Sequence, residues 1–162
     1  MASHREHELF NITLLVPSLY FVPGDYRVFF GIGYLLGTFL LSPDIDLSYS
    51  KPSQRIGKLK YLWFPFWIFS KHRGITHVPF LGSLIKIFYL MLIFVIGYFI
   101  ILGIFSIINF IPKWFLTFNP FEFIQNLFVK EEFFYFLLGI ILADILHIIL
   151  DGITSFLKKN RL

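Results

Sequence analysis

The sequence contains no cysteine, and only 15% of its 162 residues are charged. Without cysteine there are neither disulfide bonds nor thiolate ligands, so a metal ion would have to be bound by imidazole and carboxylate groups. The formal net charge of +4 is small and scattered, which argues against a nucleic-acid partner. The first residues also lack the long apolar segment of a secretory signal, so we expect no cleaved signal peptide.

Apolar residues are what the sequence has in excess. They make up 57% of the chain, with 23 phenylalanines, whereas soluble domains contain roughly 45–50% apolar residues. Membrane-crossing helices are expected over about residues 4–22, 26–41, 79–111 and 133–157. The sequence therefore predicts an all-α fold, an integral membrane helical bundle of about four transmembrane helices, in a single domain over residues 1–162.

Local signals refine these predicted spans. Ser3 and Glu6 have the spacing of a capping box, so a helix should begin directly after Ser3. Residues 48–73 and 112–132 are expected to be interfacial loop segments, the first because its Trp and Tyr residues favour the headgroup level. The second span carries small residues that would let a neighbouring helix approach closely. These residues are Gly31, Gly33 and Gly37.

The basic residues are distributed unequally between the two sides of these spans. Eleven of the fourteen Lys and Arg residues fall on the side of the termini, and Arg27, Lys113 and Lys130 fall on the other. Because cytoplasmic loops carry an excess of Lys and Arg, we expect a multi-pass protein of the inner (plasma) membrane with both termini in the cytoplasm. The cations assigned to the cytoplasmic side are Arg5, Lys51, Arg55, Lys58, Lys60, Lys71, Arg73, Lys86, Lys158, Lys159 and Arg161.

Chemically active residues gather at this predicted cytoplasmic end. Asp144, His147 and Asp151 are spaced i, i+3 and i+7, which places them on one stripe of the last helix. Ionisable groups at such depth cost at least about 2.5 kcal/mol each, so they should face the bundle interior and be paired or bound to metal. Interhelical hydrogen bonds to Ser, Thr or Lys are the alternative explanation.

Asp44 and Asp46 follow Pro43, where an extended or turn backbone would direct both carboxylates to the same side. Two carboxylates so placed suit a divalent cation. The alternative to a metal site is an ordinary helix cap and loop pair, because Asp is common after a helix ends.

His4 and His7 lie one helical turn apart near the start of the chain. His7 is the stronger ligand candidate, because a solvated helix start explains His4 equally well.

A second pair of imidazoles occurs in the segment from His72 to His77. No single helical face presents residues five apart, so a turn at Gly74 must bring them together or give them different tasks. One would bind metal while the other acts as acid or base, and Arg73 could bind an anionic oxygen. Thr76 could cap the following helix. The alternative is a solvated basic loop.

Taken together, these motifs resemble an uncharacterised bacterial family of predicted metal-binding integral membrane proteins. The resemblance covers most of the chain, and the motifs that carry it are residues 3–8, 41–47, 57–63 and 72–79. More distantly, the chain resembles the membrane-bound, predicted metal-dependent hydrolases of the DNA-damage response. By position, the resemblance implies a metal site made by Asp44, Asp46, His72, His77, His147 and Asp151, with His7 as a further candidate.

The leading functional hypothesis is a metal-dependent hydrolase at the cytoplasmic membrane surface. One or two divalent ions, most simply Zn or Mn, would activate water beside a phosphoester or lipid-linked phosphate. His72, Arg73 and Asp46 are the candidates for catalytic roles, and Lys86 is a further cation for a phosphate. Membrane lipid is the expected partner, and the oligomeric state is left open.

The alternative function is that of a non-catalytic metal-binding membrane protein, either a sensor or a transport component. The ligand candidates are His7, Asp44, Asp46, His77, His147 and Asp151.

Overall fold

The computed structural model describes residues 3–69 and 74–160, and over these residues it contains helices and no strand. The all-α prediction is therefore confirmed. The longer helices are α1 (His4–Tyr20), α2 (Arg27–Phe39), α5 (Leu81–Ile107), α7 (Pro120–Val129) and α8 (Glu131–Lys159). Shorter α-helices are α3 (Lys51–Arg55), α4 (Phe64–Phe69) and α6 (Lys113–Thr117). The 3-10 turns are η1 (Gly24–Tyr26), η2 (Pro43–Asp46), η3 (Gly57–Trp63) and η4 (Ile75–His77).

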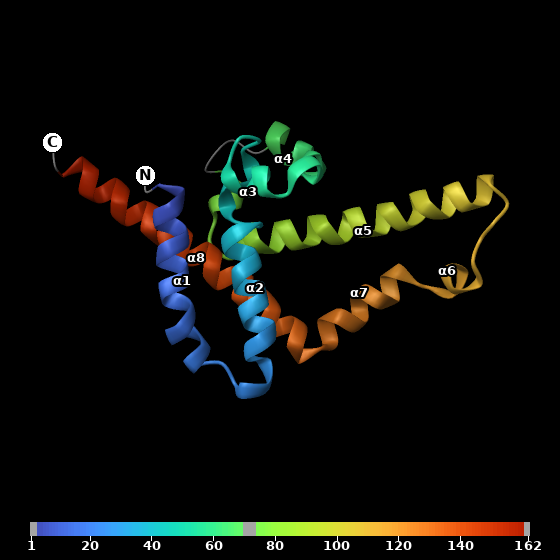
Figure 1. The fold of residues 1–162 in the computed structure, drawn as a ribbon, viewed down its shortest axis with the longest axis horizontal. Helices are drawn as coiled ribbons and strands as arrows, with labels where there is room; N and C mark the ends of the chain where they lie inside the picture. The colour runs from blue at the N-terminus through green and yellow to red at the C-terminus, as the bar shows by residue number, and fades with distance from the viewer. Residues whose placement is uncertain (1–2, 70–73, 161–162) are drawn as a thin grey trace.

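The helices form an asymmetric molecule (Figure 1). α1 and α2 run antiparallel and α8 crosses them, while α5 projects to one side and α6 and α7 return beneath it. The segments from η2 to α4 gather at the end where both termini lie. Thus α1, α2 and α8 form the packed part of the predicted bundle, whereas α5 leaves it.

The start of α1 follows the sequence prediction. The Ser3 side chain accepts a hydrogen bond from the Glu6 amide, and the Glu6 carboxylate accepts one from the Ser3 amide. These two bonds form a capping box, which satisfies amides that would otherwise lack a partner at a helix start. Pro17 lies inside α1, so the helix continues through it.

The glycines of α2 explain why α2 and α8 pack so closely. A Cβ atom at Gly33 would lie 2.0 Å from the Phe136 carbonyl oxygen, and one at Gly37 would lie 3.0 Å from the Ala143 Cβ. A Cβ at Gly31 would meet nothing nearer than 4.0 Å. The close-approach prediction is therefore confirmed at Gly33 and Gly37, whereas Gly31 faces away from α8.

Buried hydrogen bonds fix the relative positions of α1, α2 and α8. Asn11 donates to the Thr38 hydroxyl at 3.2 Å and to the Ala143 carbonyl at 3.1 Å, and the Tyr34 hydroxyl donates to the Asn11 carbonyl at 2.7 Å. Asn11 is only 2% exposed. Because a buried polar group left without partners is costly, these bonds hold the three helices in one register.

Residues 112–132, predicted to be a loop segment, contain α6 and α7. Asn119 caps α7 by accepting from the amides of Phe121 and Glu122, and Pro120 occupies the first helical position. This Asn-Pro pair is a local signal for a helix start that is present in the sequence. The prediction of a loop was wrong here.

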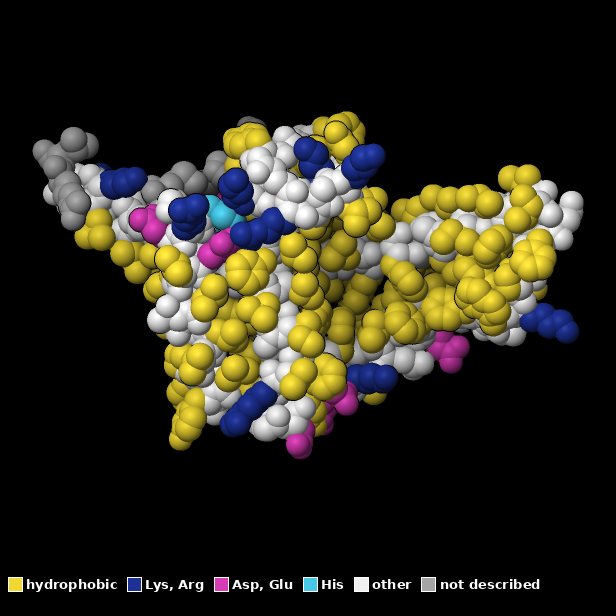
Figure 2. Space-filling view, in the orientation of Figure 1, with side chains coloured by type: hydrophobic (Ala, Val, Ile, Leu, Met, Phe, Trp, Pro, Cys, Tyr) yellow, Lys and Arg dark blue, Asp and Glu magenta, His cyan; other side chains and the backbone are white. Residues whose placement is uncertain are grey.

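Within the described residues, two helices, α5 and α8, are long and apolar enough to cross a membrane by length and composition. The most apolar 18-residue window of α5 is 0% buried, and that of α8 is 28% buried. Of the other two predicted spans, α1 has 17 residues and α2 has 13. Apolar side chains cover much of the surface, with Lys and Arg gathered toward its upper and lower margins (Figure 2).

Candidate metal centre

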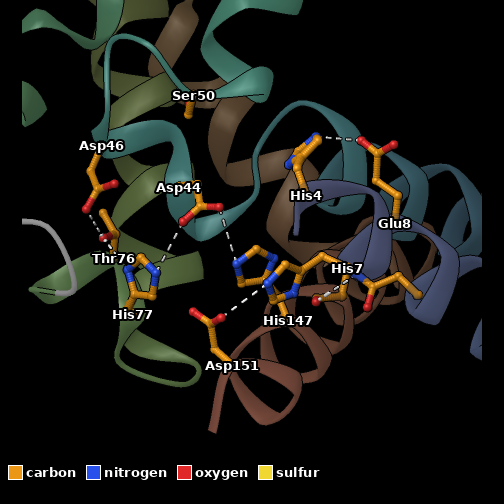
Figure 3. Close-up of polar contacts among 12 residues, drawn as sticks. His4, His7, Glu8, Asp44, Asp46, Ser50, Thr76, His77, His147 and Asp151 are labelled. Atoms are coloured by element: carbon orange, nitrogen blue, oxygen red, sulfur yellow. Dashed lines mark hydrogen bonds and ion pairs between the residues drawn. The ribbon is translucent and has the colours of Figure 1, made fainter. Parts of the chain in front are cut away.

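Five of the predicted ligands converge at one end of the packed helices (Figure 3). α1 contributes one of them, η2 and η4 contribute one each, and α8 contributes two, so four distant segments of the chain meet. This set is a candidate metal site, to which we refer as the metal centre, and it comprises His7, Asp44, His77, His147 and Asp151.

The metal centre contains two overlapping groups of three ligands. The potential ligand atoms of His7, His147 and Asp151 lie within 4.8 Å of one another, and so do those of Asp44, His77 and His147. His147 belongs to both groups and is only 3% exposed. Its ring stacks on that of His7, with 3.8 Å between centroids.

The spacing within the centre fits a shared cation. The Nε2 atoms of His77 and His147 lie 3.5 Å from Asp44 Oδ1 and Oδ2 respectively. That is long for a strong hydrogen bond, but two ligands of a tetrahedral ion with bonds of about 2.1 Å lie roughly 3.4 Å apart. His147 Nε2 and Asp44 Oδ1 are buried and form no hydrogen bond with the described residues. The donor set therefore fits a divalent metal ion.

The Asp44 carboxylate is the electrostatic link between the two histidines. Burial by itself would raise its pKa, but the imidazoles of His147 and His77 facing it hold the pKa well below its ordinary value. Asp44 is therefore ionised at neutral pH. An ionised carboxylate with one oxygen toward each imidazole is a suitable ligand for one ion or a bridge between two.

Asp46 is not among these ligands, although the sequence placed it beside Asp44. Both residues lie in the 3-10 turn η2, where three residues complete a turn, so side chains two apart point in different directions. Asp44 faces the histidines, while Asp46 accepts a hydrogen bond of 2.9 Å from the Thr76 hydroxyl. The expectation that both carboxylates face the same side was wrong, because the turn that contains them is a 3-10 helix.

Thr76 also differs from its predicted part as a helix cap. α5 begins at Leu81, after Phe80, and Thr76 lies in the preceding turn η4. Its hydroxyl contacts Asp46 and, at 3.3 Å, the Nδ1 atom of His77. The sequence contained no signal for this role, because the contact joins residues 30 positions apart.

Asp144 lies on the predicted stripe of α8 but outside the metal centre. Its Oδ2 atom accepts hydrogen bonds from Ser83 and from Lys86, the latter at 2.6 Å. The stripe prediction is confirmed, because Asp144, His147 and Asp151 are all buried. For Asp144, however, hydrogen bonding between helices is the explanation that applies. Lys86 is 0% exposed and therefore does not offer its charge to a substrate.

His4 lies apart from the metal centre. Its Nε2 atom is 2.7 Å from Glu8 Oε1, and the same carboxylate oxygen pairs with Arg55. Figure 3 shows this pair directed away from Asp44 and His147. His72 and Arg73, the other predicted catalytic residues, lie outside the described residues.

A hollow of about 310 Å³ opens beside the metal centre. Two of the residues that line it, His77 and Asp151, belong to the centre, and Gly152 and Ser155 form part of its rim. A Cβ atom added at Gly152 would meet nothing within 4 Å, so this side of α8 is open. The hollow therefore provides access to the ligands from outside the protein.

The chain is similar to a known protein family and to a protein of another organism. Residues 2–161 match the model of a family described as "Uncharacterized metal-binding protein (DUF2227)". An "Uncharacterized protein" of Aquifex aeolicus (strain VF5) is 62% identical over 138 residues, which cover 85% of this chain and 98% of that protein. No solved structure matches the chain.

Proposed function

Because the chain belongs to this family of metal-binding proteins, we propose that it is a membrane-bound, metal-dependent hydrolase whose ion is held by the metal centre. The observation that carries the proposal is the convergence of five His and Asp side chains from four segments. The two Nε2 atoms that face Asp44 at 3.5 Å supply the spacing that such an ion needs.

The membrane part of the proposal is supported by α5 and α8, whose length and composition suit a bilayer. We propose that α1 and α2 complete four spans in the plasma membrane. The two termini lie at the same end of the molecule (Figure 1), as an even number of spans requires. The excess of Lys and Arg in the terminal segments and in residues 48–73 supports a cytoplasmic location for that end.

The proposed ion is Zn or Mn, because imidazole and carboxylate ligands suit both metals. One ion could use a single group of three ligands, whereas two ions could share the Asp44 carboxylate, which presents one oxygen to each of two histidines. When bound at such a site, a divalent ion polarises an ester and makes a water molecule a better nucleophile.

We propose a phosphoester or a lipid-linked phosphate as the substrate. The hollow beside His77 and Asp151 extends along α8 to Ser155, and Lys158 lies three residues further along the chain. The surface there carries positive charge, which would favour the approach of an anionic group. In the membrane orientation proposed here, that surface lies at the cytoplasmic headgroups. Membrane lipid is accordingly both the proposed environment and a proposed source of the substrate.

One observation favours a second function, that of a non-catalytic metal-binding protein. Five protein ligands are more than a catalytic zinc site uses, because such sites keep a position open for water and substrate. If all five side chains closed on a single ion, the site would be structural or sensory. The hollow beside His77 and Asp151 favours the hydrolase.

The test is elemental analysis of the purified protein in detergent, followed by an assay against a panel of phosphoesters. We expect a transition metal in the wild type, and its loss in His77→Ala and His147→Ala. His4→Ala is the matched control, because this histidine pairs with Glu8 outside the centre. Equal metal content in all four proteins would end the metal-site proposal. Metal without hydrolysis of any phosphoester would favour the second function.

A further inference from the structure

The Thr76 hydroxyl lies between a carboxylate and an imidazole. Its oxygen is 2.9 Å from Asp46 Oδ2 and 3.3 Å from His77 Nδ1. Thr76 is 1% exposed and Asp46 is 3% exposed, so water competes little for either group. These contacts join η2 to η4, the two turns that carry the ligands Asp44 and His77.

The direction of each hydrogen bond follows from counting protons. A hydroxyl group has one proton to donate, and an ionised carboxylate can only accept. The Thr76 proton is therefore directed to Asp46, which leaves lone pairs of the hydroxyl oxygen facing His77 Nδ1. To form a hydrogen bond with these lone pairs, Nδ1 must carry a proton.

The position of that proton decides what the other ring nitrogen can do. A neutral imidazole has a single N–H, so a proton on Nδ1 leaves a lone pair on Nε2. In this structure Nε2 is the atom that faces Asp44 Oδ1 inside the metal centre. The hydroxyl thus selects the form of His77 whose Nε2 can bind an ion that lies between this nitrogen and Asp44.

We propose that Thr76 and Asp46 are positioning residues that hold the proton of His77 on Nδ1 and fix the direction of its ring. This inference rests on the proposed metal centre and assigns Asp46 a task other than binding the ion. Residues that orient a metal-binding histidine are commonly worth about 10- to 100-fold in metal affinity.

The test compares two substitutions of Thr76. Thr76→Val keeps the shape of the side chain and removes the hydroxyl, whereas Thr76→Ser keeps the hydroxyl and removes the methyl group. We expect Thr76→Val to weaken zinc binding about 10- to 100-fold in a chelator competition. We expect Thr76→Ser to stay within about threefold of the wild type, and circular dichroism would show that both proteins keep their helices.

A second readout uses the zinc-loaded protein. In ¹⁵N NMR spectra a metal-bound ring nitrogen is distinguishable from a protonated one, and we expect the metal on Nε2 and the proton on Nδ1 of His77 in the wild type and in Thr76→Ser. In Thr76→Val the Nδ1 proton loses its hydrogen bond, so it should exchange with water faster. Metal on Nδ1 in the wild type would overturn the inference, as would an equal loss of zinc affinity in Thr76→Val and Thr76→Ser.

His77→Ala separates this inference from the proposal on which it rests. Loss of metal in His77→Ala with unchanged zinc affinity in Thr76→Val would leave the metal centre intact and reject the role of Thr76. Retention of metal by His77→Ala would reject the metal centre itself.

Discussion

The Lys86 ammonium lies 2.6 Å from the Asp144 carboxylate, and both groups are buried, with exposures of 0% and 2%. Lys86 also donates a hydrogen bond to the carbonyl of Leu41, two residues beyond the end of α2, and Ser83 donates to the Asp144 carboxylate. One side chain of α5 therefore joins α8 to the segment that leads into Asp44. The pair therefore links α5 to two segments that carry ligands of the metal centre, namely α8 and the segment that leads into Asp44.

Removing this ammonium should destabilise the fold. Lys86→Met leaves the Asp144 carboxylate buried without its counter-charge, which should cost about 3–5 kcal/mol of the free energy of unfolding. The double variant Lys86→Met with Asp144→Leu should recover most of that loss. Thermal unfolding in detergent measures both effects, with the exposed Lys58→Met as control. Unchanged stability in Lys86→Met would show that the pair is not needed.

The contact between α2 and α8 should be equally sensitive at Gly139. A Cβ atom there would lie 2.2 Å from the Phe30 carbonyl oxygen and 2.6 Å from the Tyr34 amide nitrogen. Gly139→Ala should therefore lower the free energy of unfolding by about 1–3 kcal/mol, as overpacking does. Gly103→Ala in α5 is the control, because a Cβ at that position meets nothing within 4 Å. Equal stability of the two variants would contradict this packing.

The hollow beside the metal centre predicts a steric effect on anion binding. Gly152→Phe should fill the hollow and weaken the binding of inorganic phosphate to the zinc-loaded protein at least about tenfold, while metal content stays unchanged. Gly103→Phe, far from the hollow on α5, should bind phosphate as the wild type does. Isothermal titration calorimetry measures the binding. Phosphate binding by Gly152→Phe at wild-type strength would mean that substrates reach the ligands from another side.

The overlap of the two ligand groups predicts how metal stoichiometry responds to single substitutions. His147 belongs to both groups, whereas His7 belongs to one. If the centre holds two ions, His7→Ala should lose one of them and His147→Ala both. If it holds one ion, bound by the group of Asp44, His77 and His147, then His147→Ala should lower the metal content below about half an ion per chain and His7→Ala should not. Elemental analysis decides between these outcomes. Full metal content in His147→Ala would contradict both.

The sequence by itself determined features that depend on spacing within one segment. The capping box at Ser3 and the buried stripe of Asp144, His147 and Asp151 were both predicted correctly, because residues on one helix have a fixed angular relation. The helical class followed from composition and apolar runs. Even the missed helix α7 had a local signal in Asn119 and Pro120.

Only the tertiary structure decided how neighbouring polar residues divide their tasks. The 3-10 turn η2 rotates Asp44 toward the histidines and Asp46 toward Thr76. Lys86 pairs with Asp144 because α5 and α8 meet there, 58 positions apart in the chain. Spacing along a chain fixes angles inside a helix, but the partners of a side chain depend on which distant segments pack against it, and these emerge only when the whole chain is folded.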